Sequence, residues 1–418
     1  MRKLTRRSLF GLGVPLPLYL CGCSDDEKAP STADPTADED IEIFSWWIAP
    51  GEADAFDALV SLHESSHPHQ RPYNAAIESG ERAREVLAER LQAGEPPDIY
   101  QENVYNLGTV MAQNPNSLIP LDDLFEELGL SSVVVPEVLA DVTFDGKIYS
   151  MPVNIHRENA VHYNKKIFED LGLAIPTTLE ELLAACETLK AAGITPLATS
   201  HEGWVQRILF QALHAAIIGA QPFADYLTAS SPTEDARLED AIDLLDEVLG
   251  KYVNESAGDE GFGWADAAQL VLDGKAAMFI HGDWAKGYLV QLGWKPGEGF
   301  GVFAMPGATD LFFYGVDVFA LVKGSQHATA ARDFLRTVAS KAGQLAFNEI
   351  KGSSPVRLDV DESKLDIVAQ GTLRDLRDAK VRLLVRRREE WDLALGAFAL
   401  DRDKDALRQV LVDFPPLP

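Results

Sequence analysis

Short stretches with the period of a β-strand alternate with amphipathic helical stretches along this chain of 418 residues, and this alternation limits the folds open to it. Residues 41–45 alternate apolar and polar side chains, and residues 52–66 place apolar side chains at helical spacing. A second helix is predicted over residues 81–93, followed by a short strand over 98–101. Strands and helices in alternation pack as a sheet covered by helices, so the pattern predicts an α/β fold.

Three local signals predict further elements. Asp-Gly between two apolar runs indicates a β-hairpin over residues 142–149. Thr178 and Glu181 have the spacing of a capping box that opens a helix. The nearly continuous apolar character of residues 315–322 predicts one buried strand, and residues 328–338 are predicted to be helical.

Composition limits the class of protein and its partners. With 46% hydrophobic and 24% charged residues, the chain resembles ordinary soluble globular proteins, and its length suits two or three structural units. The net charge of −28 repels phosphate backbones, which argues against nucleic acid as a partner. The acidity itself indicates solubility rather than a particular ligand.

The first 22 residues are the predicted export signal, because basic residues precede a short, interrupted apolar stretch at 9–20. The sequence TRRSLF at 5–10 resembles a twin-arginine signal. The sequence LCGC at 20–23 resembles a bacterial lipobox, so we expect removal of residues 1–22 and attachment of a lipid to Cys23. The mature chain then retains only Cys23 and Cys186, and no disulfide is expected.

Residues 23–40 are predicted to be a lipidated, disordered tether. From residue 24 onward they carry no bulky apolar side chain and cannot bury enough surface to become ordered. A flexible coil of about 17 residues spans roughly 20–25 Å. We therefore expect the folded part to stay close enough to a membrane to dock onto a membrane partner.

Four motifs, in their order along the chain, resemble those of bacterial extracellular solute-binding proteins, the family of the maltose- and glucose-binding proteins of ABC importers. They are LIPLDD at 118–123, DGKIYSMP at 145–152, YNKKIF at 163–168 and GKAAM at 274–278. The resemblance covers nearly all of the mature chain. It implies a type II periplasmic-binding-protein fold, in which two α/β lobes flank a ligand cleft and the chain crosses between them repeatedly.

The resemblance also implies discontinuous lobes. Residues 41–152 plus about 312–356 are assigned to an N-terminal lobe, and residues 153–311 plus part of 357–418 to a C-terminal lobe. The implied function is capture of a small sugar by a monomeric protein that delivers it to the permease subunits of an ABC importer on the extracytoplasmic side of the membrane. No cofactor and no metal are implied.

Within this family the chain is most similar to the glucose-binding branch. The motifs that carry this similarity are WW at 46–47, NIHR at 154–157, GDWAKG at 282–287 and KGSSPVR at 351–357. The resemblance implies ligand contacts for Trp46, Trp47, Glu52, Gln101, Trp264, Trp284, Asp317 and Lys351, with His156 as a weaker addition.

The residue types suit a sugar, which needs flat aromatic walls for its C–H faces and planar polar groups for its hydroxyls. Neighbouring residues in extended chain point opposite ways, so at least one of Trp46 and Trp47 is expected to face a cleft. Asp317 lies inside an apolar strand and needs a partner if buried. The alternatives left open are core packing for the tryptophans, helix capping for Glu52, solvent exposure for Lys351 and stabilisation of a crossing segment for His156.

Two departures from the glucose pattern fall within the implied site. Asn103 stands where that branch has a cationic or imidazole side chain, and it carries no charge. No histidine follows His327, and residues 386–388, all arginine, with Trp391 occupy the region where that branch places one. Glucose is therefore one candidate ligand, and a polyol is another.

An enzyme is the alternative class. HESSH at 63–67 matches the zinc-protease motif H-E-x-x-H, but Pro68 disfavours helical geometry at His67 and no third ligand is indicated. No nucleophile elbow or P-loop is present in the sequence. A secreted carbohydrate-active hydrolase remains the enzymatic rival, since it too uses tryptophan walls and paired carboxylates.

Overall fold

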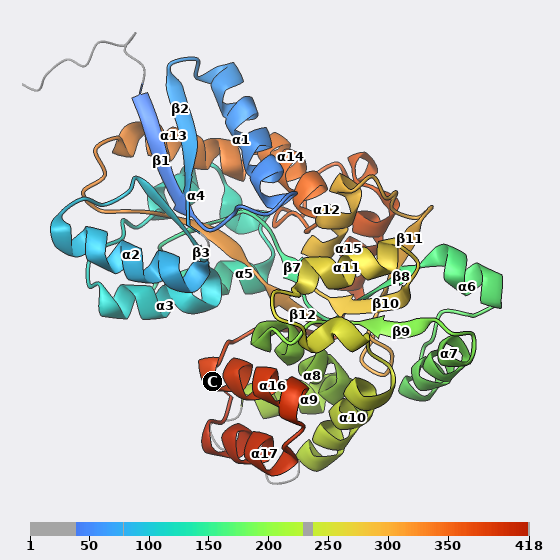
Figure 1. The fold of residues 1–418 in the computed structure, drawn as a ribbon. Helices are drawn as coiled ribbons and strands as arrows, with labels where there is room; N and C mark the ends of the chain where they lie inside the picture. Colours follow the sequence, from blue (N-terminus) through green and yellow to red (C-terminus); the bar gives the residue numbers. More distant parts are fainter. Residues whose placement is uncertain (1–38, 78, 229–236, 417–418) are drawn as a thin grey trace, which may run out of the picture. The chain divides into compact units, whose positions relative to one another are not determined.

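The computed structural model describes residues 39–77, 79–228 and 237–416, which belong to one compact unit, Asp38–Pro418 (Figure 1). The predicted export signal, Cys23 and residues 24–38 of the tether lie outside the described residues, whereas the last two tether residues, Glu39 and Asp40, are ordered in a strand, Glu39–Ser45, so the predicted end of the tether is wrong by two residues. Strands and helices alternate from the first described residue onward, so the predicted α/β class is confirmed.

The described chain forms two parts, each built around its own large sheet. The first part is built around a five-stranded sheet. Its strands, in order across the sheet, are β2 (Gln70–Ala76), β1 (Glu39–Ser45), β3 (Ile99–Asn103), β13 (Asp317–Leu321) and β6 (Met151–Pro152). β1 pairs in parallel with β2 and β3, whereas β13 runs antiparallel to β3 and β6. Sequence-distant segments therefore share one sheet. The helices around this part are α1 (Glu52–Ser66), α2 (Gly80–Ala93), α3 (Val104–Gln113), α4 (Asp122–Glu127), α5 (Pro136–Asp141), α13 (Ala328–Ala339) and α14 (Lys341–Lys351).

A four-stranded sheet forms the second part, in the order β11 (Phe300–Ala304), β8 (Ala160–Asn164), β10 (Ala276–His281) and β9 (Thr195–Ala198). β10 is buried at every position, which is typical of a strand covered on both faces. The helices around it are α6 (Lys165–Leu171), α7 (Leu179–Ala191), α8 (Gly203–Ile218), α9 (Ala220–Thr228), α10 (Leu238–Lys251), α11 (Trp264–Leu272), α12 (Trp284–Gln291), α16 (Glu389–Asp401) and α17 (Lys404–Asp413).

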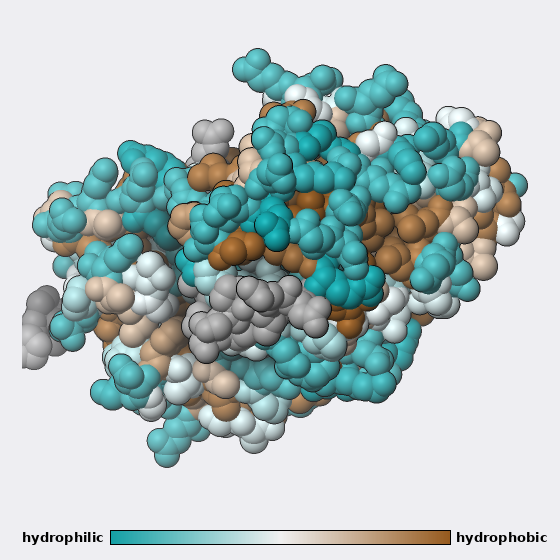
Figure 2. Space-filling model, turned by 90° about the horizontal axis from the view of Figure 1, so that it is seen from below, coloured by the Kyte–Doolittle hydropathy of each residue, from teal (hydrophilic) through white to brown (hydrophobic). Residues whose placement is uncertain are grey.

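Each large sheet has its own hydrophobic core. One cluster of buried side chains surrounds the five-stranded sheet and includes residues of α15 (Ile367–Asp378), such as Leu373 and Leu376. A second surrounds the four-stranded sheet and includes Trp391 and Phe398 of α16, with a smaller third cluster beside α11 and α12. The face shown in Figure 2 is mostly hydrophilic with scattered hydrophobic patches, in keeping with the acidic composition.

A three-stranded sheet of β14 (Val381–Leu384), β12 (Leu311–Gly315) and β7 (His156–Arg157) connects the two parts. The crossing segments are residues 153–157, which lead from β6 into β7, and residues 315–317, which lead from β12 into β13. They run side by side, because the Val153 amide donates to the Asp317 carbonyl and Gly315 pairs with His156. This is where the polar side chains of the site converge.

Local signals predicted the positions of several elements well. The hairpin forms between β4 (Thr143–Phe144) and β5 (Lys147–Ile148), and the capping box of Thr178 and Glu181 opens α7. The predicted single strand over 315–322 is wrong at its start. The chain changes sheets at Val316, so β12 and β13 belong to different sheets although both are fully buried. Hydrophobicity cannot reveal that division, because burial looks the same on either side of it. The described part of the chain also contains three short 3₁₀ helices, at Leu130–Ser132, Glu255–Gly258 and Glu362–Lys364.

Candidate functional site

A cavity of 590 Å³ lies beside the crossing segments. Its lining residues come from both parts of the fold: the chain after β1 and β3, the crossing segments, and the first turns of α8, α11 and α12. Nine of the ten predicted ligand residues line it, namely Trp46, Trp47, Glu52, Asn103, His156, Trp264, Trp284, Asp317 and Lys351. The tenth, Gln101, is fully buried behind the cavity, with its side-chain amide 3.4 Å from Asp317 Oδ1.

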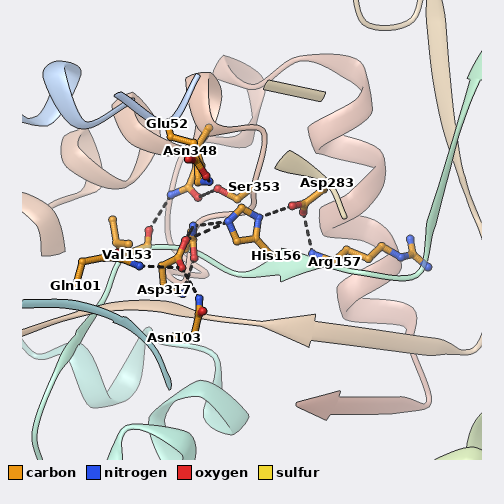
Figure 3. A network of polar contacts seen from close by, with 12 residues as sticks. Glu52, Gln101, Asn103, Val153, His156, Arg157, Asp283, Asp317, Asn348 and Ser353 are labelled. Carbon is orange, nitrogen blue, oxygen red and sulfur yellow. Dashed lines mark hydrogen bonds and ion pairs between the residues drawn. The ribbon is translucent and has the colours of Figure 1, made fainter. Parts of the chain in front are cut away.

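Asp317 is the acceptor at the centre of a polar network on the crossing segments (Figure 3). Its side chain is 5% exposed, yet Oδ1 accepts from Asn103 Nδ2 at 2.7 Å and Oδ2 accepts from Asn154 Nδ2 at 2.8 Å. His156 Nε2 lies 3.1 Å from the same Oδ2. Burial alone raises the pKa of the Asp317 carboxyl, but the hydrogen bond and charge of His156, with the Lys351 charge and the Asn154 amide, hold its pKa below the usual range.

His156 bridges two carboxylates. Its Nδ1 lies 2.5 Å from Asp283 Oδ1, at the start of α12, while its Nε2 faces Asp317. Burial lowers the pKa of His156, but the two carboxylates more than offset that effect and raise it to about 9. Both ring nitrogens are thus protonated and donate at neutral pH. The Asn154 amide lies 2.9 Å from His156 Nε2, but since both groups are donors, that contact is not a hydrogen bond.

The wall beside β1 combines an indole pair with an ion pair. Trp47 is 1% exposed and packs in the core against Phe319 and Phe347, whereas Trp46 is half-buried, and both line the cavity. Glu52 opens α1 and Lys351 ends α14, and their charges meet with Nζ 2.6 Å from Oε1. Each charge also suits the dipole at its helix end.

Glycine allows α14 to end close to α12 at this wall. Gly352 follows Lys351 with a φ of +91°, and a Cβ there would lie 2.6 Å from the backbone nitrogen of Gly287. The same close approach places the Lys351 ammonium 5.8 Å from the centre of the Trp47 ring. Lys351 is therefore fixed on the cavity wall rather than solvated, because its side chain is only 3% exposed.

Three tryptophans form the opposite wall around a buried histidine. Trp264 stacks on His281 with an interplanar angle of 20°, Trp204 lies 5.1 Å from the same ring, and Trp284 meets it edge-on. The Trp284 indole N–H donates to His281 Nε2 at 3.0 Å. Burial lowers the pKa of His281 well below its usual value, so the imidazole is neutral and can accept that bond. The indole faces of this wall are suited to the C–H faces of a sugar.

Charged groups close one end of the cavity. Arg207 on α8 donates to Glu158 Oε2 at 3.2 Å and to Asp392 Oδ1 at 3.0 Å, and Arg387 donates to the other oxygen of Asp392. Glycine at 203 permits this, because a Cβ there would lie 2.0 Å from the backbone oxygen of Asp392. Tyr105 reaches the same end from α3, with its hydroxyl 3.1 Å from Asn103 Oδ1. The guanidinium and carboxylate groups present planar donors and acceptors to a ligand.

Comparison with known proteins identifies the family. Residues 50–345, well over half of the chain, match the family model for bacterial extracellular solute-binding protein. This chain belongs to that family. A relative from Pyrococcus horikoshii, an uncharacterized ABC transporter extracellular-binding protein, is 32% identical over 398 residues and covers 91% of this chain and 87% of that protein. A probable sugar-binding periplasmic protein of Brucella suis is 30% identical over 345 residues, covering 82% of this chain and 80% of the relative.

Solved structures agree with the predicted fold of this solute-binding protein. The bacterial solute receptor AcbH superposes with a TM-score of 0.76 at 18% identity, covering 89% of this chain and 96% of that one. The raffinose complex of the binding protein RafE gives a TM-score of 0.74 at 20% identity, covering 90% and 98%. The predicted type II periplasmic-binding-protein fold is confirmed. The family and these neighbours are substrate-binding receptors rather than enzymes.

The H-E-x-x-H match in this solute-binding protein has a structural explanation. His63 is fully buried on α1, and its two ring nitrogens contact Thr337 Oγ1 at 2.8 Å and Gln70 Oε1 at 2.9 Å. α1 ends at Ser66, so His67 lies beyond the helix, as expected from Pro68. Across residues 39–77, 79–228 and 237–416, no group of three or more His, Cys, Asp or Glu residues is arranged to hold a metal, and no helix is long and apolar enough to cross a membrane.

Sequence reasoning missed several lining residues, notably Trp204, Glu158, Arg207 and Tyr105. Trp204 lies in the first turn of α8, beyond the loop that follows β9, whereas Trp46 directly follows β1, so the signal that marked Trp46 did not mark Trp204. Arginines 386–388 were noted in place of the absent histidine, and of these only Arg387 lines the cavity. Trp391, noted with them, is packed in the core of the second part.

Proposed function

We propose that this protein captures a neutral mono- or small oligosaccharide in the 590 Å³ cavity and delivers it to the permease of an ABC importer. The observation that carries the proposal is the cavity itself, with Trp46 on one wall, Trp204, Trp264 and Trp284 on the other, and charged planar groups between them. Indole faces accommodate sugar C–H faces, and buried planar donors and acceptors discriminate among hydroxyls. Family membership and sugar-binding relatives support the same reading.

The identity of the sugar is a finer proposal, in which a glucose-like ligand is favoured. Relatives carry different names: a xylose/arabinose-binding protein of Haloferax volcanii is 24% identical over 82% of this chain, and a glucose-binding protein of Saccharolobus solfataricus is 21% identical over 59%. Asn103 and Arg387 in the cavity differ from the glucose pattern. A pentose or a polyol is therefore included among the ligands to be tested.

A hydrolase fits the cavity less well. Glycosidases need one carboxyl group whose pKa is raised so that it can donate a proton to the leaving oxygen. The central carboxyl here, Asp317, has its pKa lowered by His156 and is occupied by several donors. Glu52 and Glu158 are engaged by Lys351 and Arg207. Carboxylates held in this way by protein donors act as hydrogen-bond acceptors rather than as proton donors.

Export, anchoring and lobe movement complete the proposal. We propose that residues 1–22 are removed, that Cys23 carries a lipid, and that the protein acts as a monomer on the extracytoplasmic side without a cofactor. The extracellular and periplasmic relatives support an exported location. The assignment of 41–152 with about 312–356 to one lobe, and of 153–311 with part of 357–418 to the other, rests on the two separate cores and the crossing segments between them. Ligand contacts on both walls favour a closed arrangement of the lobes.

The direct test is a thermal-shift screen over monosaccharides, disaccharides and polyols, followed by calorimetric titration of the best ligand. Trp46→Ala is expected to weaken binding about tenfold or more while the protein stays folded, because Trp46 is only half-buried. Trp294→Ala is the matched control, since Trp294 packs on Phe300 away from the cavity and its loss leaves affinity unchanged. A panel of chromogenic glycosides run in parallel should give no turnover; hydrolysis would replace the receptor function with the enzymatic one.

A further inference from the structure

A second cavity, of 560 Å³, lies between α15 and the β8–β11 edge of the four-stranded sheet. One side is lined by α15, whose buried residues belong to the core of the first part. The other side is lined by Tyr163 and Phe303, which pack against the core of the second part. The cavity therefore lies between the two cores, as the 590 Å³ cavity does, but shares no lining residue with it.

Strand geometry sends neighbouring side chains of β7 to the two cavities. His156 lines the 590 Å³ cavity and Arg157 lines the 560 Å³ cavity, because consecutive residues of a strand point to opposite faces. Figure 3 shows the Arg157 guanidinium pointing away from His156. Asp283 ties the two residues together, since its Oδ1 contacts His156 and its Oδ2 accepts from the Arg157 backbone amide at 2.9 Å.

The Arg157 guanidinium is buried but only partly satisfied. The side chain is 1% exposed, with Nη1 2.5 Å from Asp375 Oδ2 and Nε 3.2 Å from Asn159 Oδ1. Its Nη2 has no hydrogen-bond partner among the described residues. A buried guanidinium nitrogen without an acceptor is costly, which favours an acceptor supplied from outside the chain.

Two further cations line the same cavity. Lys165 Nζ donates to the Gly297 carbonyl at 2.6 Å and has two donors left, and Arg374 extends from the exposed side of α15. Arg374 has no ion-pair partner among residues 39–77, 79–228 and 237–416. Among the described residues that line the cavity, Asp375 is the only carboxylate, so these residues carry a surplus of two positive charges in a chain whose net charge is −28. The electrostatic potential in the cavity is therefore positive although the molecule as a whole is negative, and a positive potential attracts anions.

We propose that this cavity binds a small dianionic oxyanion of the phosphate or sulfate class, held by Arg157, Lys165 and Arg374. The planar guanidinium fork suits a tetrahedral oxyanion, and Lys165 supplies a point charge. The bound anion contacts α15 on one side and the start of α6 on the other, so it links the two cores at a face that the sugar cavity does not use. The anion site does not depend on the proposed sugar function.

The test is calorimetric titration of the sugar-free protein with sodium sulfate and with sodium phosphate, at ionic strength held constant with sodium chloride. Arg374→Ala removes one contact without disturbing the core, because this side chain is exposed, and is expected to weaken binding about tenfold. Lys165→Gln should weaken it comparably. Arg377→Ala is the matched control on the same helix, since Arg377 pairs with Glu362 and does not line the cavity. The affinity of this variant for sulfate and phosphate should match that of the native protein.

Arg157→Gln should abolish binding, and its circular dichroism shows whether it folds. If it does not fold, the Arg374 and Lys165 variants decide the question alone. Absence of sulfate and phosphate binding at millimolar concentration, or binding that these two variants leave unchanged, would overturn the proposal. Sugar affinity is measured separately on the same preparations, so a failure of the anion site and a failure of the sugar function are distinguished.

Discussion

Because His156 is protonated in the folded protein, it should make the free energy of unfolding depend on pH. The His156→Gln variant should lack that pH dependence. In the native protein the His156 side chain is 7% exposed and lies between Asp283 and Asp317. In the variant, Asp283 keeps the Arg157 backbone amide and Asp317 keeps the amides of Asn103 and Asn154. Both carboxylates thus retain hydrogen-bond donors. The contribution to the unfolding free energy that the variant loses is therefore that of the titrating His156 ring.

The magnitude follows from the two pKa values of the ring. Its pKa is about 9 in the folded chain, against 6.5 for the unperturbed side chain that represents the unfolded state. Because the folded pKa is the higher one, the stabilisation is fully present below pH 6.5 and is lost as the pH rises toward 9. The shift corresponds to about 3 kcal/mol of unfolding free energy.

The assay is urea unfolding of the native protein and of His156→Gln at a series of pH values from 6 to 10. Taking the difference between the two proteins cancels the titration of groups that they share. The difference in unfolding free energy should shrink by about 3 kcal/mol across that range. A difference that stays constant would show that folding does not raise the pKa of His156, and the ion-paired assignment of the ring would be wrong.

Three other outcomes follow from burial and bonding. Trp47→Ala should lower the unfolding free energy by about 3–5 kcal/mol in urea titrations, since Trp47 is packed against Phe319 and Phe347, and a loss of under about 1 kcal/mol would contradict that packing. Asp317→Asn should weaken sugar binding about 10- to 100-fold by calorimetry, because a charged acceptor becomes neutral; unchanged affinity would remove Asp317 from the site. Burial raises the pKa of the Cys186 thiol to about 12, so Ellman's reagent should label it only after unfolding, and rapid labelling of the folded chain would contradict the buried placement.

Local rules account for what the sequence revealed of the fold. α1 begins and ends where helical spacing and Pro68 placed it, and the Asp-Gly hairpin and the α7 capping box formed at the predicted residues. Each of these features is decided by interactions within a few residues of one another. The division of residues 315–322 between two sheets is decided instead by pairing with β3 and β7, more than 150 residues away, which no local pattern contains.

The contrast between local and long-range interactions also separates the parts of the site that were predicted from the parts that were missed. The family resemblance singled out ten residues for the site, and the structure brings nine of those ten to one cavity. The network that fixes them was not predicted, because the acceptors of His156 lie 127 and 161 residues further along the chain. Arg207 likewise meets Asp392 across 185 residues.

Charge state in the site therefore depends on tertiary structure rather than on residue type. His156 and His281 are both buried beside Trp284, yet two carboxylates raise the pKa of the first, while burial lowers that of the second. One ring is consequently a cationic donor that holds the crossing segments, and the other is a neutral acceptor that orients an indole. The two histidines have opposite roles, and only the contacts made by each ring distinguish them.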